Sequence, residues 1–323
     1  MMKKFITLLL LFLLSYTLFA QQEYQISHNM FNKLPVNPAY AGINNAICAN
    51  LIVHQQWNGF KDNEGNKIAP QTNIISIDGK VNLLRGGLGL SIIQDQLGFY
   101  KNTNLELDYS YHMPLAEGTL GLGLQLGFYN NTLDFSKFLP VDESDPLLNG
   151  ISSTEKNMMM ELGLGAFYNQ DNAYLGLSTA KLLQRKKSIA NTENGDTYIN
   201  FTRHYFFTGG YKYELPNHPA FELNPSFFVK SDIASTQLDI NTLLKYNNKF
   251  WGGLSYRGTF FGKNAINGVA FFAGIKIKDI HIGYAYDLSI KSINKGGHEI
   301  IAGYCFNFNI EKIPEGYKNV RFL

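Results

Sequence analysis

Apolar and polar residues alternate with a period of two along most of this chain. In residues 279–287, isoleucines and tyrosines alternate with polar or small residues, which is the side-chain period of a β-strand. Residues 300–310 repeat the pattern, with aliphatic and aromatic side chains on one face and Gly303, Cys305 and two asparagines on the other. The two segments predict a hairpin whose strands each have an apolar face and a small or polar face.

The same alternation predicts further strands ahead of this hairpin. The clearest is 120–128, where four leucines and Phe128 face away from three glycines and Gln125. With the hairpin the total is about fourteen strands of about ten residues, and single-chain bacterial outer-membrane barrels have even strand numbers. The remaining predicted strands lie at about 46–57, 71–81, 87–94, 105–113, 158–166, 173–183, 205–213, 221–230, 238–246, 250–257 and 266–277.

The connections are sorted by length. Those after even-numbered strands are mostly short, as at 113–118 and 246–249, whereas 58–70, 130–154 and 184–200 follow odd-numbered strands and are long and polar. Outer-membrane barrels have short periplasmic turns and long external loops. The sequence therefore predicts an all-β fold, a transmembrane antiparallel up-and-down β-barrel of the outer-membrane type. A secreted two-sheet sandwich with aromatic core faces is the alternative, but it gives no reason for this sorting.

The two ends of the chain lie outside the strand pattern. Residues 1–20 combine two lysines, an apolar run and Ala20, which predicts a secretory signal peptide cleaved after Ala20 rather than a retained membrane anchor. Residues 21–45 lack the two-residue period, so we expect an extended segment, either periplasmic or folded into the lumen as a plug. The transmembrane barrel is then 46–310, with a periplasmic tail at 311–323 and both termini in the periplasm.

Composition agrees with one membrane-embedded β domain. Tyrosine (19), phenylalanine (24) and glycine (30) are abundant against 2 cysteines and 2 tryptophans. Without Lys3 and Lys4 the 28 basic residues fall to 26 and balance the 26 acidic ones, so charge gives no reason to expect a nucleic-acid partner. After the signal peptide no apolar run reaches the length of a transmembrane helix, so contact with the bilayer must be made by strands.

The predicted lumen face carries charges of both signs. Since buried charges persist by pairing, we expect ion pairs to close the lumen at least in part, with a solvated channel as the alternative. These residues are Glu106, Asp108, Glu161, Lys212, Glu214, Glu222, Lys230, Asp239, Lys245, Arg257 and Lys276.

Motifs for chemistry are weak. The glycine pairs at 121 and 123 and at 163 and 165 lie inside strands, so small lumen positions explain them better than a nucleotide loop. His298 and Glu299 begin like a zinc-protease motif, but Ala302 stands where the second histidine would be. We therefore expect no catalytic residue, no metal site and no cofactor.

A lumen hydrolase is the one enzymatic alternative left open, because polar side chains of the right types share the predicted lumen face. The histidines are His54, His112 and His281, and the carboxylates are Glu106, Asp108 and Asp287.

The two cysteines occupy the first and last strands. Cys48 and Cys305 both face the predicted lumen near the periplasmic end, and the first and last strands of a closed barrel are neighbours. Exported proteins form disulfides, so a bond across this seam is possible if the register places the two residues opposite each other.

Several stretches in order resemble the PorP/SprF family of type IX secretion and gliding-motility membrane proteins. They are NPAYAG (37–42), HQQW (54–57), RHYFFTGGY (203–211), NPSFFVK (224–230), FWGGLSYR (250–257) and the closing IGYAYDLSI with GGHEI. The similarity runs from about residue 37 to 308. The motif residues are Asn37, Pro38, Ala39, Tyr40, Ala41, Gly42, Trp57, Arg203, His204, Tyr205, Pro225, Tyr256, Arg257, Tyr286, Asp287, His298 and Glu299.

The resemblance implies an outer-membrane accessory component of the type IX secretion system. Such a protein would assist export or surface attachment of specific cargo proteins or adhesins, and its partners would be the bilayer, secretion components and the cargo. No catalytic residue comes with the family. A passive or substrate-specific pore is the alternative function. Long external loops such as 142–154 and 184–200 would face cargo, and the two ends of the chain would face periplasmic partners.

Overall fold

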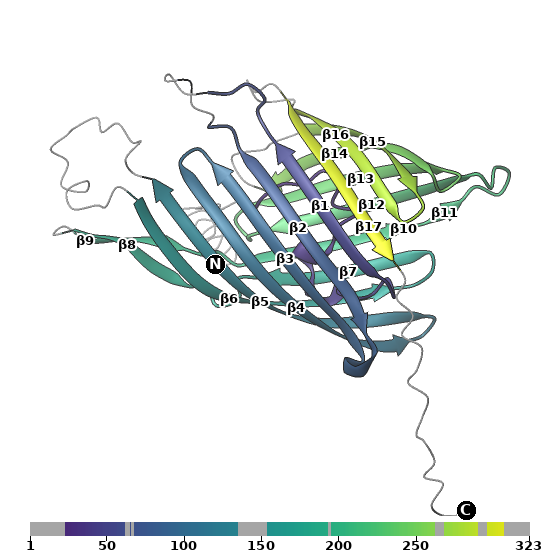
Figure 1. Cartoon of the computed structure of the whole chain (residues 1–323), viewed down its shortest axis with the longest axis horizontal. Helices are drawn as coiled ribbons and strands as arrows, with labels where there is room; N and C mark the ends of the chain where they lie inside the picture. The colour runs from purple at the N-terminus through teal and green to yellow at the C-terminus, as the bar shows by residue number, and fades with distance from the viewer. Residues whose placement is uncertain are drawn as a thin grey trace, which may run out of the picture.

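The chain folds into a closed antiparallel β-barrel (Figure 1). The computed structural model describes residues 23–61, 65, 68–134, 154–192, 195–261, 268–289 and 296–306. Within them the wall has fourteen strands: β1 (Ile47–Gln55), β2 (Gln71–Val81), β3 (Gly86–Leu97), β4 (Tyr100–Leu115), β5 (Gly118–Asp134), β6 (Thr154–Asn169), β7 (Ala173–Ala180), β10 (His204–Tyr211), β12 (Phe221–Ser231), β13 (Thr236–Tyr246), β14 (Phe250–Phe261), β15 (Gly268–Ile277), β16 (Ile280–Ser289) and β17 (Gly297–Phe306).

The barrel predicted from the two-residue period is confirmed, and each predicted strand corresponds to one strand of the wall. The two-residue β11 (Tyr213–Glu214) continues the pairing of β10 with β12. Strands β4, β5 and β6 have 16, 17 and 16 residues, which is longer than expected. At one end of each strand, polar residues continue the pairing beyond the alternating apolar stretch from which the strand was predicted. Signal peptide, tail and residues 307–310 lie outside the described part of the chain.

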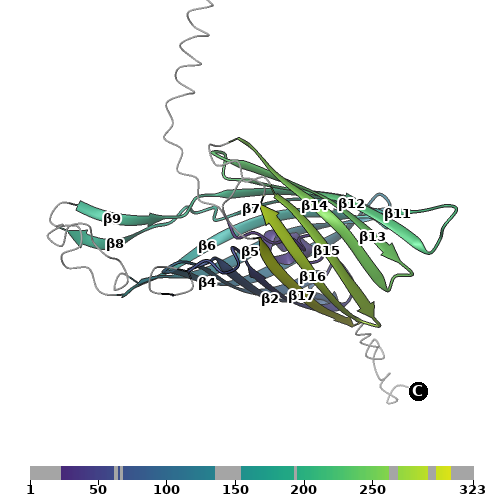
Figure 2. The same cartoon turned by 90° about the horizontal axis from the view of Figure 1, so that it is seen from above.

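One expected loop is instead a hairpin. Within residues 184–200, β8 (Lys186–Thr192) pairs with β9 (Gly195–Asn200) in a separate two-stranded sheet. Figures 1 and 2 show this hairpin extending away from the wall between β7 and β10. These two short strands pair with each other, and their largely polar sequences lack the apolar alternation by which the membrane strands were predicted.

The two ends of the barrel differ. We call the end with residues 116–117, 170–172, 247–249 and 278–279 the short-turn end, and the opposite end, which bears the β8–β9 hairpin and the connection after β1, the long-loop end. Strand β1 begins and β17 finishes at the short-turn end. No helix among the described residues is long and apolar enough to cross a membrane; the helical turns are η1 (Leu34–Val36), η2 (Pro38–Tyr40) and η3 (Asn82–Leu84).

Apolar side chains cover the outside of the wall, as the alternation predicts. Leu122 and Leu124 on β5 are each nearly half exposed, while Gln125 on the same strand is buried. Exposed apolar side chains on a closed wall of paired strands are what a hydrocarbon environment stabilises.

The lumen is less polar than the sequence suggested. Its largest apolar cluster contains Ile26 of the amino-terminal segment and buried side chains from β1–β3 and β13–β17, and Tyr24, Met30 and Phe31 pack against it. The members of the cluster are Ile26, Ile52, Ile74, Ile93, Leu243, Trp251, Phe272, Ala285 and Ile301. Their strands carry adjacent apolar pairs such as Ile74 and Ile75, and such pairs place one apolar side chain on each face.

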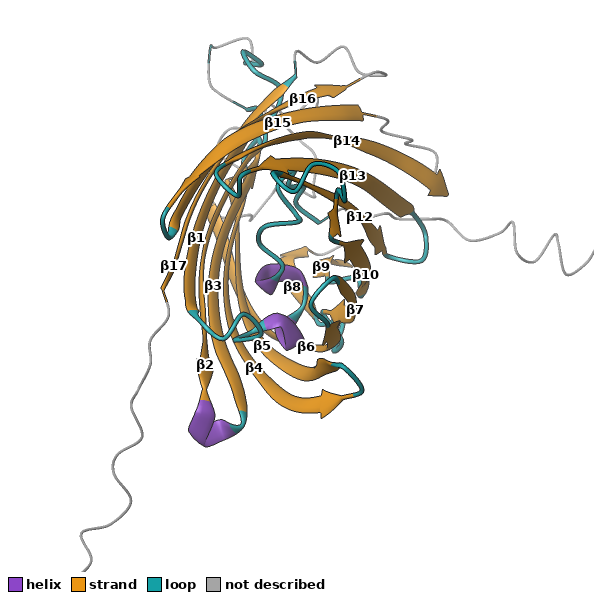
Figure 3. Ribbon diagram, turned by 90° about the vertical axis from the view of Figure 1, so that its right-hand side faces the viewer, coloured by secondary structure: helices purple, strands orange, loops and turns teal. Residues whose placement is uncertain are grey.

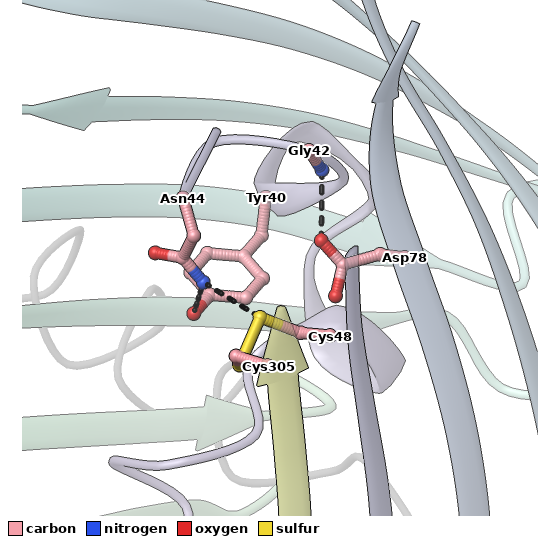
Figure 4. The surroundings of a disulfide bond; sticks show 6 residues. All are labelled: Tyr40, Gly42, Asn44, Cys48, Asp78 and Cys305. Atoms are coloured by element: carbon pink, nitrogen blue, oxygen red, sulfur yellow. Dashed lines mark hydrogen bonds between the residues drawn. A yellow bond between two sulfur atoms is a disulfide. The ribbon is translucent and has the colours of Figure 1, made fainter. Parts of the chain in front are cut away.

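A disulfide joins the first and last strands (Figure 4). Strands β1 and β17 pair in a register that sets Cys48 opposite Cys305, with Cα atoms 4.1 Å apart. Cys48 is buried on the lumen side, and Tyr40, Gly42 and Asn44 lie beside the bond (Figure 4). Covalent closure therefore occurs where the two strands most distant in sequence meet.

Replacing Cys48 with Ser is expected to destabilise the barrel. The bond closes a loop with a sequence separation of 257 residues, and removing such a cross-link typically costs about 2–4 kcal/mol because the unfolded chain gains conformational freedom. Urea unfolding of purified protein in detergent measures the loss. Thiol titration of unreduced, denatured wild-type protein is the matched control, and two reactive thiols there would contradict the bond.

Candidate functional site: the occupied lumen

The amino-terminal segment lies inside the barrel. Residues 23–46, which we call the plug, run through the ring of strands, with η1 and η2 visible within it in Figure 3. Glu23 contacts Lys181, just beyond the long-loop end of β7, whereas Gly42 N donates to Asp78 Oδ2 (2.8 Å) near the short-turn end of β2. The first described residue therefore lies at the long-loop end of the lumen. The side of the membrane on which the amino terminus lies stays a prediction.

Glu299 on β17 anchors the plug most directly. Its carboxylate accepts the backbone N–H of Ser27 at 2.8 Å and of His28 at 2.7 Å, and His28 Nδ1 lies 2.6 Å from Oε1. Glu299 and His28 are fully buried. Because charge-assisted hydrogen bonds from two amides and a ring nitrogen saturate the carboxylate, its burial stabilises the plug instead of opposing it.

Asp287 and His54 extend this anchor to two more strands. Ser27 Oγ donates to Asp287 Oδ1 at 2.5 Å, and His54 Nε2 lies 2.8 Å from Asp287 Oδ2. His54 Nδ1 lies 2.7 Å from Gln25 O. Strands β1, β16 and β17 thus hold one short stretch of the plug.

Arg257 on β14 holds the same stretch from another side. Its Nε donates to both oxygens of Asp239 on β13, at 3.2 and 3.1 Å. Its two terminal nitrogens donate to Gln25 Oε1 (3.1 Å) and Ile26 O (3.2 Å). A guanidinium suits this place because it can bind a carboxylate and a backbone carbonyl at once.

The start of the plug is held by charge. Glu23 forms an ion pair with Lys181 and lies 3.5 Å from His204 Nδ1, and Lys230 Nζ donates to its carbonyl at 3.0 Å. Burial alone would raise the pKa of Glu23, but Lys181, His204 and Lys230 outweigh it and hold the pKa at about 2. Glu23 is thus charged at neutral pH and fixed at the long-loop end.

The NPAYAG stretch forms the other half of the plug and follows the glycines of the wall. The Asn37 side chain accepts from Ala39 N (3.0 Å), and its amide donates to Ala166 O (3.1 Å) and Leu177 O (3.4 Å) on β6 and β7. A Cβ at Gly123 would overlap the backbone of Ala39. Backbone overlaps with the stretch would also occur at Gly87 and Gly121, and a Cβ at Gly165 or Gly176 would meet the Asn37 side chain.

The motif residues lie in several places. Those of the plug, together with Arg257, Asp287 and Glu299, meet in the lumen as described. Tyr256, Tyr286 and His298 lie on the other face, where Tyr284 Oη is 2.6 Å from His298 Nδ1. Trp57, Arg203, His204 and Tyr205 stand at the long-loop end, Arg203 donating to Leu182 O at 2.8 Å, and Pro225 lies on β12.

Some charged side chains of the lumen form ion pairs, and others form hydrogen bonds with uncharged groups. Arg257 pairs with Asp239, and Lys245 with Glu222 at 2.8 Å. Glu161 instead accepts the backbone N–H groups of residues 183 and 185, while Glu106 and Asp108 accept from Tyr129 Oη and Gln125 Nε2, each at 3.1 Å. Lys276 and Glu214 are exposed. Ion pairs alone therefore do not close the lumen, and the plug also occupies it.

The three histidines considered for a hydrolase contact different parts of the plug. His54 bonds to Asp287 and the plug, His112 Nε2 lies 3.0 Å from Ala41 O, and His281 stacks on Phe31. Within the described residues no group of three or more histidine, cysteine or acidic side chains could hold a metal ion. His54, His112 and His281 thus each contact the plug.

Sequence reasoning missed Gln25, Ser27 and His28. They lie in a segment without periodicity, so no pattern pointed to them, although the carboxylates that hold them were recognised. The described geometry makes the plug, with its anchors on β1, β14, β16 and β17, the candidate functional site.

Comparison with known proteins gives the family of the chain and supports its fold. The family model described as type IX secretion system membrane protein PorP/SprF matches residues 18–304. The crystal structure of the Ralstonia pickettii toluene transporter TbuX is similar, with TM-score 0.52 and 11% identity over 85% of this chain and 93% of that one. At this identity the likeness concerns the fold alone, and it is that of an outer-membrane barrel.

Two further solved structures resemble the chain more loosely. The TodX deltaS2S3 mutant monoaromatic hydrocarbon channel has TM-score 0.49 and 12% identity over 88% of this chain and 95% of that one. The CymD monoaromatic hydrocarbon channel has TM-score 0.49 and 11% identity over 90% and 95%. A search of curated proteins finds no match.

Gly123→Ala is expected to displace the NPAYAG stretch. The new Cβ would overlap backbone atoms of Ala39, and backbone of a packed turn cannot yield as a flexible side chain can. Limited proteolysis should then cut within residues 23–46. Gly252→Ala is the matched control, since its nearest neighbour would be 3.5 Å away; equal protection of both variants would contradict this packing.

Glu299→Gln is expected to loosen the plug. The amide keeps the shape of the side chain but loses the charge that three donors share, a loss of about 1.5–3 kcal/mol for hydrogen bonds to a charged group. Planar-bilayer recordings should show more frequent and larger openings than the wild type. Glu117→Gln, in the exposed β4–β5 turn, should behave as wild type, and identical traces for all three proteins would refute the anchoring role.

Proposed function

The chain belongs to the PorP/SprF family of type IX secretion system membrane proteins, and from this premise we propose that it is an accessory component of that system. It would assist export or surface attachment of particular cargo proteins or adhesins, of the gliding-motility type, through protein–protein contacts. Family membership and the outer-membrane barrel fold support the setting, and the cargo role is the proposal.

The occupied lumen is the observation that favours a role in protein–protein contacts over a role as a pore. Residues 23–46 are held by side chains from at least four strands, including Glu299, Asp287 and Arg257. A polypeptide cargo could pass only if this whole network came apart, which breaks several charge-assisted hydrogen bonds together. Surfaces at the two ends of the barrel remain for recognition.

The two ends suit different partners. In outer-membrane barrels the short turns face the periplasm and the long loops face outward, and we propose the same orientation here, after cleavage of residues 1–20. The β8–β9 hairpin would then reach outward toward cargo. The short-turn end and the residues after β17 would face periplasmic components of the secretion system.

A substrate-specific pore is the second candidate. The solved structure from Ralstonia pickettii with the same fold is described as a toluene transporter. A pore role requires the plug to move aside in the wild-type protein, so large conductance without any substitution would support it. Low conductance together with co-purification of secretion components supports the accessory role.

Deleting the gene is expected to stop the release or surface display of particular proteins. The surface and culture-medium proteomes of wild-type, deletion and complemented cells measure the effect. Complementation with a variant in which residues 186–200 are replaced by a short glycine-serine linker should restore the barrel but not display. Lys249→Met, in the exposed β13–β14 turn, is the complementing control. Unchanged secretion and display in the deletion strain would overturn the proposed role.

A further inference from the structure

A cavity of about 220 Å³ opens at the short-turn end of the barrel. It is far larger than the roughly 10–15 Å³ that one water molecule requires. The plug forms one wall, the β6–β7 turn another, and strands β10, β12 and β13 the rest. Its lining includes Met30, Phe31, Lys33, Tyr174, Leu243 and Lys245.

Lys33 is a buried cation without a carboxylate partner. Its side chain points to Met30 O, to which Nζ donates at 2.6 Å, and lies over the rings of Tyr174 (4.5 Å) and Tyr40 (5.4 Å). Only 8% of the residue is exposed. Among the described residues no acidic side chain lies within ion-pair distance of it. Burying an ammonium with so little compensation is costly.

Two other lysines line the cavity, and one carboxylate neutralises both in part. Lys245 Nζ lies 2.8 Å from Glu222 Oε1, and Lys212 Nζ lies 3.4 Å from Glu222 Oε2. Lys212 also pairs with the exposed Glu214 at 2.9 Å. Glu222 is therefore shared, and its charge is already committed away from Lys33.

Charge and surroundings together favour an anion. Burial, and then the nearby Lys245, lower the pKa of Lys33 to about 8, so at neutral pH most molecules keep a positive charge that no carboxylate in the described part of the chain neutralises. Met30, Phe31 and Leu243 supply an apolar floor, and the side chains of Asn169 and Asn172 add polar lining. The amides of Gln170 and Asn224 donate to Glu117 Oε2 and Glu222 Oε1, each at 2.9 Å. The one acidic lining residue is Asp171, exposed on the β6–β7 turn.

We propose that this cavity binds an acidic peptide segment of a partner protein, with one glutamate or aspartate carboxylate received between Lys33 and Lys245. The neighbouring apolar residues of the segment would rest on the floor formed by Met30, Phe31 and Leu243. Such a site deepens the contact role proposed above and rests on it for the identity of the bound molecule as a protein. The barrel orientation would make that partner periplasmic.

Binding of a defined peptide to the purified full-length protein in nanodiscs tests the site. The probe is a fluorescent, amidated peptide of sequence Gly-Leu-Glu-Leu-Gly, and the matched probe carries glutamine in place of glutamate. Fluorescence anisotropy should show saturable binding of the first. The second should bind about tenfold more weakly, as expected when one charge-assisted hydrogen bond is lost.

Three substitutions tie the binding to the cavity. Lys33→Met should reduce affinity about tenfold, and Lys33→Arg should restore most of it. Asp171→Asn should increase affinity severalfold, because it removes a repelling charge at the mouth without touching the plug. Lys249→Met, at the same end of the barrel but outside the cavity lining, should leave binding unchanged.

The outcomes separate the site from the wider role. Equal binding of the two peptides, no saturable binding, or equal losses in Lys33→Met and Lys249→Met would overturn the site. Displacement of the peptide by succinate at similar concentration would also overturn it in favour of a free dicarboxylate. Peptide binding with normal cargo display in the deletion strain would keep the carboxylate site and refute the secretion role.

Discussion

The wall of this protein depends on complete backbone pairing. Hydrocarbon offers no hydrogen-bond partners, so each strand must pair on both sides and the sheet must close. The pairing of β10 with β12 and of β1 with β17 completes the ring. Closure brings the two strands that are most distant in sequence together, and there Cys48 faces Cys305. The plug, residues 23–46, lies inside this closed ring.

A closed wall encloses polar side chains that must find hydrogen-bond partners inside the barrel. Here a segment of the same chain occupies it, and the polar groups of the wall find partners on that segment. Glu299 is the clearest example, because two backbone amides and a histidine of the plug compensate its buried charge. On the opposite side the glycines of β3, β5, β6 and β7 allow the NPAYAG turns to approach the backbone of the wall. Apolar packing around Trp251 and Phe31 fills the space between.

The two ends of the lumen are occupied differently. At the long-loop end Glu23 is surrounded by cations that hold it in its charged form. At the short-turn end Lys33 contacts a carbonyl and two rings, and no carboxylate of the described residues pairs with it. A barrel that keeps its interior filled and its charge imbalance near one mouth is suited to recognising partners at its ends. That arrangement fits an accessory protein of a secretion system better than a passive conduit.

The sequence by itself determined the wall. The two-residue period, the even number of strands and the sorting of connections by length are local properties, so the fourteen strands and the outward face of residues such as Leu122 were predictable. Parity also placed the anchoring side chains Arg257 and Asp287 on the inner face, whereas Glu299 was recognised only as a motif residue. Only the tertiary structure decided what they bind. Their contacts with residues 25–28 span more than 200 positions, and the plug carries no periodic signal. Its path, the β8–β9 hairpin and the cavity at Lys33 follow from how separate segments pack once the ring has closed, which no local pattern encodes.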